Sequence, residues 1–341
     1  MAADLAIQEQ VMQNHDVMNV RYKTLSKTVL FSVLLATGSP VLAKQRIDQT
    51  IETSSHPNVE IEHVNGKAVI KTWDKNAVKI TGELSDRTED FEFEKTGSGV
   101  SFDVDIGRHH GDWGNYRIKD GDDLTIYVPA ASKIDYSAVS ASVQLFDITN
   151  DTKVDLVNGD IEANNLAGRI KLETVNGNVK LNGVKGELVA ETVNGDIEGE
   201  HSEGEEVRVI TVNGNIDIRS DSPQLRIESV NGRMNFTTAM INELDIVTVN
   251  GKVKGDINLA DNGDVDVSSV GGKVILKFQP DVSARFDIQA HAGGDIRNKL
   301  SNDRSQKAKY GPNEWLEFST GEGSARVEVS TVHGVIELDK R

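Results

Sequence analysis

The side chains best suited to chemistry cluster in one short segment. His109, His110 and Asp112 carry atoms that bind metal ions, and the rings of Trp113 and Tyr116 can stack on a sugar. Adjacent histidines on a strand point to opposite faces, so a metal site would need a bent loop and further ligands from elsewhere. We interpret the segment as a polar loop tip anchored by Trp113. A ligand surface made of these five residues is the functional alternative.

Repeated acidic residues raise a second hypothesis, a glycan-active enzyme that uses two carboxylates in a groove. Asp160 and Asp196 both follow an Asn-Gly pair, but the equivalent positions of other repeats hold Asn178, Asn215, Arg233 and Lys252. Such variation is typical of a solvated turn. A calcium β-roll would need tandem glycine-aspartate repeats of a much shorter period. We expect no catalytic pair, and only weak calcium binding stays open.

Other signatures of catalysis or of a cofactor are absent from the sequence. It contains no phosphate-binding loop, no dinucleotide fingerprint and no serine nucleophile elbow. It also contains no cysteine, which excludes disulfides, thiolate metal sites and a lipidated N-terminal cysteine. His63, His291 and His333 stand where Asn or Gly occupies other repeats, so we interpret them as turn substitutions. The prediction is a protein that is not an enzyme and has no cofactor or bound metal.

The charge balance limits the partners. The chain has 37 Lys and Arg against 54 Asp and Glu, a formal net charge of −17. Proteins that bind nucleic acid concentrate cations on one face, and no such cluster stands out in this sequence. Nucleic acid and anionic membranes are therefore not expected partners. We interpret the excess of carboxylates as a solubility feature, with binding of cations or basic partners as the alternative.

The first 43 residues have the pattern of a secretory signal peptide. A basic segment, an apolar stretch over residues 29–35 and a small-residue cleavage signal ending at Ala43 follow one another. The apolar stretch is shorter than the about 20 residues of a membrane-spanning helix. We predict a mature chain that starts near Lys44, has no transmembrane segment, and is exported to the periplasm or secreted. A signal peptide that begins at Met18 has the usual proportions, so we expect translation to start there.

An internal repeat organises the rest of the chain. The motif [Ser/Thr]-Val-Asn-Gly recurs every 18 or 19 residues. We predict that its Asn-Gly pairs, with that of the preceding Leu156-Val157-Asn158-Gly159, form a structural turn ladder. The pairs are Asn158 and Gly159, Asn176 and Gly177, Asn194 and Gly195, Asn213 and Gly214, Asn231 and Gly232, and Asn250 and Gly251. Self-similarity at a fixed period predicts one supersecondary unit stacked on itself.

Each unit reads as strand, turn, strand, turn. Between the turns, apolar and charged residues alternate as in a half-buried strand. The residue two beyond the glycine is apolar in successive units from Ile161 to Val274, and a second column holds Thr or Ser from Thr174 to Ser269. The Asn-Gly pair suits a corner because both residues accept positive φ at low cost. Stacked asparagines can also hydrogen-bond from coil to coil.

Two topologies fit this unit: an antiparallel meander with Asn-Gly hairpins and a solenoid of stacked coils. A meander needs a second layer over its apolar face, and no segment after Lys44 has a helical period. A solenoid encloses its own core, so we predict an all-β, β-helix-like solenoid with coils of 18–19 residues. The repeats span residues 151–341 with a polar insertion near 297–314. Residues 44–150 are expected to form a β-rich N-terminal part that caps one end.

The repeat resembles a known family. The [Ser/Thr]-Val-Asn-Gly-x-[Ile/Val] turns, the strand at 124–129 and the ending at 327–336 are similar to bacterial adhesin-like domains of unknown function, over nearly all of residues 44–341. This resemblance implies that the solenoid is right-handed. It implies no catalytic or binding residues, because that family has none to carry over.

We therefore predict a non-catalytic, exported, adhesin-like monomer that presents an extended side face to a polymer or protein of the cell envelope or of a surface. Repetition creates many aligned weak contacts, which favours polymeric ligands through avidity. Two alternatives stay open: a structural, scaffolding or envelope-stress component that stacks end to end, and a β-helix glycan-active enzyme. Two facing carboxylates in a lateral groove would indicate the enzyme, and flat uncapped ends would indicate the scaffold.

Overall fold

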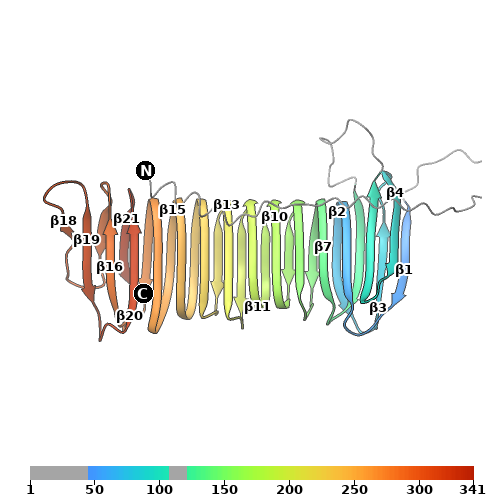
Figure 1. Cartoon of the computed structure of the whole chain (residues 1–341), viewed down its shortest axis with the longest axis horizontal. Coiled ribbons are helices and arrows are strands. Elements are labelled where there is room, and N and C mark those ends of the chain that lie inside the picture. Colours follow the sequence, from blue (N-terminus) through green and yellow to red (C-terminus); the bar gives the residue numbers. More distant parts are fainter. Residues whose placement is uncertain (1–44, 107–120) are drawn as a thin grey trace, which may run out of the picture.

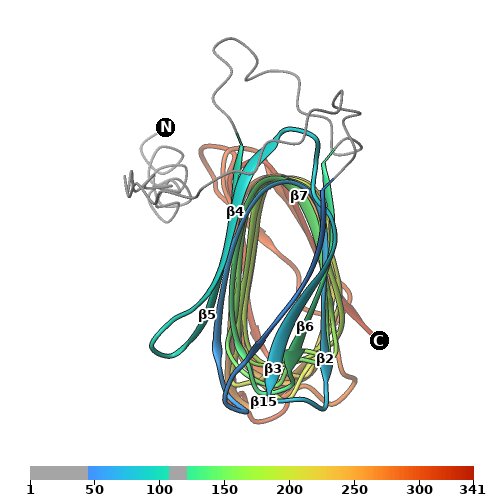
Figure 2. The same ribbon diagram turned by 90° about the vertical axis from the view of Figure 1, so that its right-hand side faces the viewer.

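The chain forms one long β-rod. The computed structural model describes residues 45–106 and 121–341, and every regular element in this part is a β-strand. The strands run across the rod axis and lie side by side along it (Figure 1). Viewed along the rod from its N-terminal end, successive coils superimpose around a flattened oval (Figure 2). The β-solenoid predicted from the repeat is confirmed.

The strands fall into three groups along the chain. The first group is β1 (Arg46–Glu52), β2 (Asn58–Trp73), β3 (Ala77–Glu83), β4 (Thr88–Lys95), β5 (Gly99–Ile106), β6 (Asp122–Pro129) and β7 (Lys133–Phe146). The central group is β8 (Thr152–Asn158), β9 (Ile161–Asn164), β10 (Ala167–Asn176), β11 (Val179–Asn194), β12 (Ile197–Ser202), β13 (Glu206–Asn213), β14 (Ile216–Ser220) and β15 (Gln224–Phe278). The last group is β16 (Ala284–Ala290), β17 (Asp295–Asn298), β18 (Gln306–Lys307), β19 (Glu314–Ser319), β20 (Ala325–Thr331) and β21 (Val335–Lys340).

Each central coil contributes to two walls. The first wall contains the segments that lead into the Asn-Gly corner, such as β8, β10 and β13, and the second wall contains those that leave it, such as β9, β12 and β14. Pairing within each wall is parallel and in register, with Thr174 beside Thr192 and Ile197 beside Ile216. Hairpins at the corners would give antiparallel pairs, so the meander is excluded.

Inward side chains of both walls fill the interior. Ile170 and Leu172 of β10 and Val179 and Leu181 of β11 are almost fully buried, while the residues between them face outward. This alternation places apolar side chains inside and charged ones outside on every coil. One apolar cluster runs through the whole rod, from Ile47 to Leu338. Its burial is the main favourable term in the folding of each coil.

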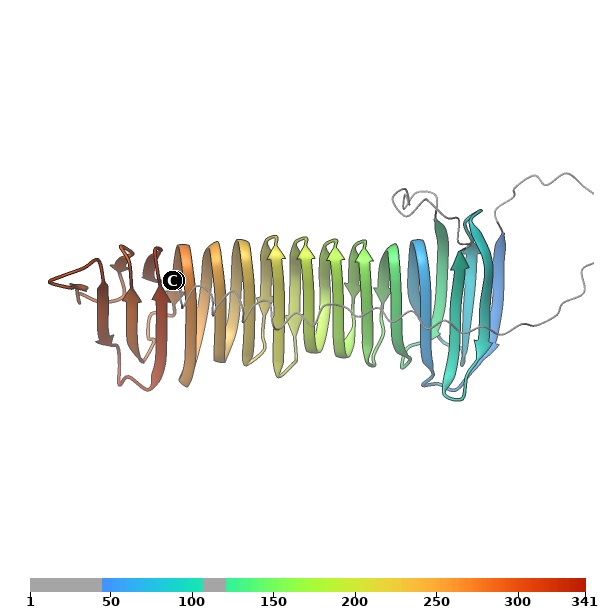
Figure 3. The same ribbon diagram turned by 45° about the horizontal axis from the view of Figure 1, so that its top comes forward.

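Both ends of the rod place coils out of sequence order. Near the N-terminal end, β2 lies between β5 and β6 on one side and β7 on the other, and antiparallel pairs of β1, β3 and β4 complete that end. Near the other end, β20 and β21 lie between the last turn of β15 and the pair β16 and β17. The C-terminus therefore lies away from the tip of the rod (Figures 1 and 3). An inserted strand cannot fray without opening neighbours on both sides.

The corner glycines are required mainly by the close approach of successive coils. Gly159 and Gly232 have positive φ values of 145° and 153°, but Gly177, Gly195 and Gly214 do not. No asparagine of the turn ladder has a positive φ. At each of these glycines after the first, a Cβ atom would overlap the carbonyl oxygen of the glycine one coil earlier. The explanation by positive φ at both residues is therefore wrong for most corners.

A threonine column supports the same corners from inside. Thr174, Thr192 and Thr211 each donate a hydroxyl hydrogen bond, of 3.0–3.1 Å, to the carbonyl oxygen of the preceding corner glycine. These hydroxyls are buried, so the bond also satisfies a polar group that would otherwise be costly inside the rod. The glycine thus allows the close approach of successive corners, and the threonine hydroxyl hydrogen-bonds to the corner from inside the rod.

Gly195→Ala should destabilise the protein by about 1–3 kcal/mol, because the new methyl group must displace the Gly177 carbonyl. Gly97→Ala in the turn between β4 and β5 is the matched control, since nothing lies within 4 Å of its added Cβ. Its effect should stay within about 0.5 kcal/mol. Urea unfolding followed by circular dichroism measures both, and equal effects would contradict the close-approach explanation.

Candidate functional site

The Asn-Gly corner forms a ladder of side-chain amides along the outside of the rod. In each bond, Nδ2 of one asparagine donates to Oδ1 of the asparagine one coil earlier. Four such bonds of 2.9–3.0 Å join, in order, Asn158, Asn176, Asn194, Asn213 and Asn231. Within the described residues, Asn250 makes no such bond to Asn231. Because these amides bind one another, the turn ladder acts first as a coil-to-coil support.

The residue after each corner glycine supports the next coil. Oδ1 of Asp160 accepts the backbone N–H of Asn178 at 2.7 Å, and Oδ1 of Asn178 accepts that of Asp196 at 2.9 Å. Asp196 in turn accepts the N–H of Asn215 at 2.7 Å. In these four repeats the position supplies a side-chain oxygen, from Asp or Asn, whereas Arg233 and Lys252 occupy it in the next two repeats. The sequence shows Asp or Asn at this position in four successive repeats, although we interpreted the variation there as that of a solvated turn.

The predicted ligand surface at His109, His110, Asp112, Trp113 and Tyr116 lies outside the described residues and stays a prediction. In residues 45–106 and 121–341, no group of three or more His, Cys, Asp or Glu side chains is arranged to hold a metal ion. Within the described residues, the outer surfaces of the two walls are therefore the candidate binding surfaces.

His63 belongs to a buried polar network, so its interpretation as a turn substitution is wrong. Its Nδ1 lies 2.9 Å from the hydroxyl of Tyr136, and its Nε2 lies 2.9 Å from Oδ2 of Asp122. The other oxygen of Asp122 accepts the Ser85 N–H at 2.5 Å and the Thr88 hydroxyl at 3.3 Å. Burial raises the pKa of Tyr136, so its hydroxyl stays protonated and can donate to His63. The network ties the inserted strand β2 to β6 and β7, and the buried side chains of His63, Asp122 and Tyr136 cannot meet a ligand.

Tyr136→Phe should destabilise the N-terminal coils by about 1–3 kcal/mol, because Nδ1 of His63 would be buried without a partner. Tyr127→Phe is the control, since the Tyr127 ring packs outside on Trp73 with a centroid distance of 5.4 Å. Hydrogen exchange of β2 and β6 should accelerate in the first variant and not in the second. Unchanged exchange in Tyr136→Phe would show that the network does not hold these strands.

The outer face of the first wall carries two adjacent rows of charged side chains, which we call the charged ladder. One row holds Lys153, Lys171, Arg208 and Arg226, and the other holds Asp155, Glu173, Glu191 and Glu228. Val189 and Ile210 each interrupt one row. Parallel stacking places successive members about 4.8 Å apart along the rod. The charged ladder thus spans five neighbouring coils, of which three carry both a cation and a carboxylate and two carry only one of them.

Ion pairs across the two rows keep the charged ladder close to neutral. Lys171 lies 2.8 Å from Glu173, and Lys153 pairs with Asp155. Arg226 lies 2.6 Å from Glu228 and also contacts Asp245 beyond the rows. Arg208 is the least satisfied cation: its nearest carboxylate oxygens are 3.8 and 4.0 Å away, and its buried Nε has no hydrogen-bond partner.

The carboxylate row has one strongly shifted group. Burial, followed by a hydrogen bond with the Asp155 carboxyl, raises the pKa of Glu173 to about 7, although Lys171 acts in the opposite direction. The folded state therefore binds a proton at Glu173 in the range from about 4.5 to 7, where the unfolded chain releases it. This contribution to stability falls as the pH rises through that range and is lost above it.

Glu173→Gln should raise the midpoint of thermal unfolding relative to the wild type at pH 8, where the wild-type carboxylate is ionised, and should change it little at pH 5. Glu187→Gln, at an exposed position of the same wall, should show no such dependence on pH. Differential scanning calorimetry at the two pH values measures both variants. A larger gain for Glu173→Gln at pH 5 than at pH 8 would contradict the assignment.

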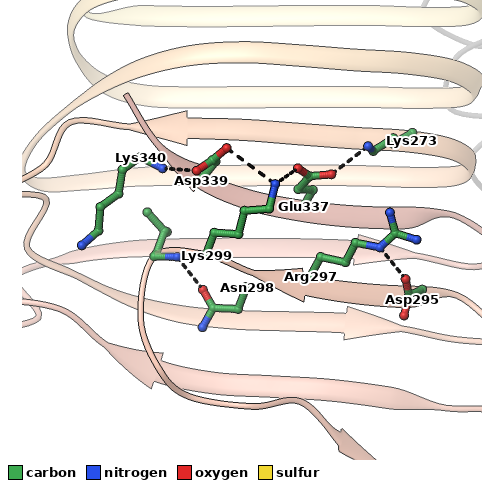
Figure 4. A network of polar contacts seen from close by, with 9 residues as sticks. Lys273, Asp295, Arg297, Asn298, Lys299, Glu337, Asp339 and Lys340 are labelled. Atoms are coloured by element: carbon green, nitrogen blue, oxygen red, sulfur yellow. Dashed lines mark hydrogen bonds and ion pairs between the residues drawn. The ribbon is translucent and has the colours of Figure 1, made fainter.

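A second ionic cluster holds the inserted C-terminal strand. Glu337 of β21 lies between Lys273 of β15, at 2.7 Å, and Lys299 just beyond β17, at 2.5 Å (Figure 4). Hydrogen bonds from the two ammonium groups lower the pKa of Glu337 to about 2. Its contribution to stability is thus present above about 4.5 and is lost as the pH falls towards 2. The cluster joins three coils, so we assign it a structural role and not a ligand-binding one.

A shallow, open depression lies on the second wall, and Gly199 is among its lining residues. Its carboxylates include Glu162, which accepts a hydrogen bond from Gln144, and Glu198, which lies 3.1 Å from Lys180. These carboxylates therefore already have partners within the wall. The depression spans five neighbouring coils, from Glu162 to Thr237, but cations and carboxylates are mixed within its rows, so it is less regular than the charged ladder.

The fold and these surfaces define a β-solenoid repeat protein with charged outer walls. No helix in the described residues is long and apolar enough to cross a membrane. A sequence model of the family described as Toastrack DUF4097 matches residues 51–339, and the chain belongs to that family. The adhesin-like resemblance of the repeats is thereby confirmed at the level of the family.

Three of the solved structures to which the chain is similar come from bacteria. A putative cell adhesion protein from Clostridium sporogenes is 10% identical, with 88% of this chain and 100% of that chain covered and a TM-score of 0.21. A putative adhesin from Bacteroides fragilis is 12% identical, with 88% and 99% covered and a TM-score of 0.34. A putative lipid binding protein from Parabacteroides distasonis is 12% identical, with 87% and 96% covered and a TM-score of 0.28. No curated protein matches the sequence. No ligand or activity is carried over from these proteins.

Proposed function

We propose that this protein is a non-catalytic, exported, adhesin-like protein that binds a polymer of the cell envelope or of a surface along its first wall. The observation that carries the proposal is the charged ladder, in which each of five successive coils presents a cation, a carboxylate or both. A polymer with a regular repeat can meet several of these groups at once, so weak contacts add up.

Arg208 is the point of the charged ladder best placed to gain from a ligand. Its guanidinium has no carboxylate oxygen closer than 3.8 Å, whereas its neighbour Arg226 has one at 2.6 Å. A hydroxyl, carboxylate or phosphate oxygen of a polymer would accept hydrogen bonds from the terminal N–H groups of Arg208, whereas the buried Nε lies out of its reach. Lys171 lies on the same row two coils away, and its side chain is about half exposed.

Export is part of the proposal. It rests on the signal-peptide pattern of residues 1–43, which lie outside the described residues. The absence of cysteine is compatible with an oxidising compartment, because the rod needs no disulfide to close its core. The expected location is the periplasm or the outside of the cell.

The mature chain, immobilised on beads, should retain a polymer or protein from cell-envelope fractions, and a glycan array should identify a polysaccharide class. Lys171→Gln combined with Arg208→Gln should weaken this binding roughly tenfold. Lys180→Gln combined with Arg219→Gln removes the same two charges from the second wall and should leave binding unchanged. If nothing is retained, or if both pairs weaken binding equally, the first wall is not the binding face.

A further inference from the structure

Among the described residues, one long strand edge at the N-terminal end of the rod has no backbone partner. β4 pairs with β5 along one edge, with Phe93 beside Phe102, and no other described strand pairs with β4. The strand is 8 residues long. At the opposite end, the outermost strands β17 and β18 have only 4 and 2 residues. An unpaired edge as long as that of β4 is a template for one more strand.

The inner face of β4 is only partly covered. Phe91 and Phe93 pack against Phe102, with ring centroids 6.2 and 6.0 Å apart, but both remain partly exposed at the end of the core. Side chains of an added strand would alternate between the two faces of the sheet. Its inward residues would therefore cover these two rings if they were apolar.

The outer face beside this edge is acidic and uncompensated. Glu92 and Glu94 are exposed on β4, and Asp103 lies beside Glu92 on β5. Within the described residues, neither glutamate forms an ion pair, and neither does Asp103. Burial, and then repulsion from Asp105, Glu92 and Glu60, raises the pKa of Asp103. The other edge strand at this end differs, since Arg46 and Lys79 pair with the carboxylates around β1.

We propose that the free edge of β4 binds an extended basic segment of a partner protein as an added β-strand. Main-chain hydrogen bonds to β4 would provide affinity, apolar residues over Phe91 and Phe93 would set the register, and Lys or Arg beside Glu92 and Glu94 would select the partner. A second copy of this chain is disfavoured, because two molecules of net charge −17 repel and two acidic edges repel most strongly. This site is separate from the charged ladder.

The probe is a fluorescein-labelled peptide of four Lys-Val repeats, which matches the 8 residues of β4. Fluorescence anisotropy with the mature protein should show saturable binding. A peptide with N-methylated valines keeps every charge but loses strand pairing, and it should bind roughly tenfold more weakly. A peptide of four Glu-Val repeats should not bind. Equal binding of the methylated and unmethylated Lys-Val peptides would overturn the proposal, because it would reveal charge attraction alone.

Variants locate the site. Glu92→Lys combined with Glu94→Lys should weaken binding of the Lys-Val peptide roughly tenfold. Glu187→Lys combined with Glu200→Lys changes the same net charge at exposed positions of the central coils and should have no effect. Circular dichroism checks that both variants fold. An equal loss of peptide binding in both double variants would overturn the proposal. Dimerisation of the wild type would also overturn it if the Glu92→Lys, Glu94→Lys variant no longer dimerised, because the partner would then be a second copy of this chain.

Discussion

Parallel hydrogen bonding between equivalent residues of successive coils is the interaction on which the rest of this rod depends. It brings each corner so close to the next that a Cβ atom at Gly195 would overlap the Gly177 carbonyl. It also aligns the threonine hydroxyls inside and the asparagine amides outside, so that each coil completes the bonding of its neighbour. Regular stacking leaves an open edge at each end of a solenoid. The out-of-order strands β2, β20 and β21 tie early and late segments into the stack, although within the described residues β4 keeps a free edge.

The register that stacks the core also stacks the charges. Like charges about 4.8 Å apart repel, so a row of cations on the first wall lies beside a row of carboxylates. Compensation is incomplete in three places: Arg208 lacks a close carboxylate, Glu173 holds a proton near neutral pH, and the acidic group around Asp103 has no cation. The first two places lie on the charged ladder and the third lies beside β4, so all three coincide with the surfaces that we propose for binding. A ligand gains most where the protein has left its own groups unsatisfied.

The sequence predicts what is periodic and misses what is not. The spacing of the glycines and the inward columns were sufficient for the solenoid, because each depends on residues one coil apart. The network of His63 could not be predicted, since its partners Asp122 and Tyr136 are 59 and 73 residues away. The insertion of β20 and β21 leaves no periodic signal either. The charged ladder could be recognised only once the register of five coils was known. The role of Asp160 could not be predicted from the sequence, because its partner is a backbone N–H of the next coil.

Stacking in register can be tested directly, because the chain has no cysteine of its own. Lys180 lies beside Glu198 on neighbouring coils, so Lys180→Cys with Glu198→Cys should form an intramolecular disulfide on mild oxidation. Glu173 and Lys180 lie on different walls, and they would face each other only if Asn176 and Gly177 formed a hairpin. Mass spectrometry of both double variants should find the disulfide in the first and none in the second. A disulfide in the Glu173→Cys and Lys180→Cys pair alone would contradict the stacked rod and every surface built on it.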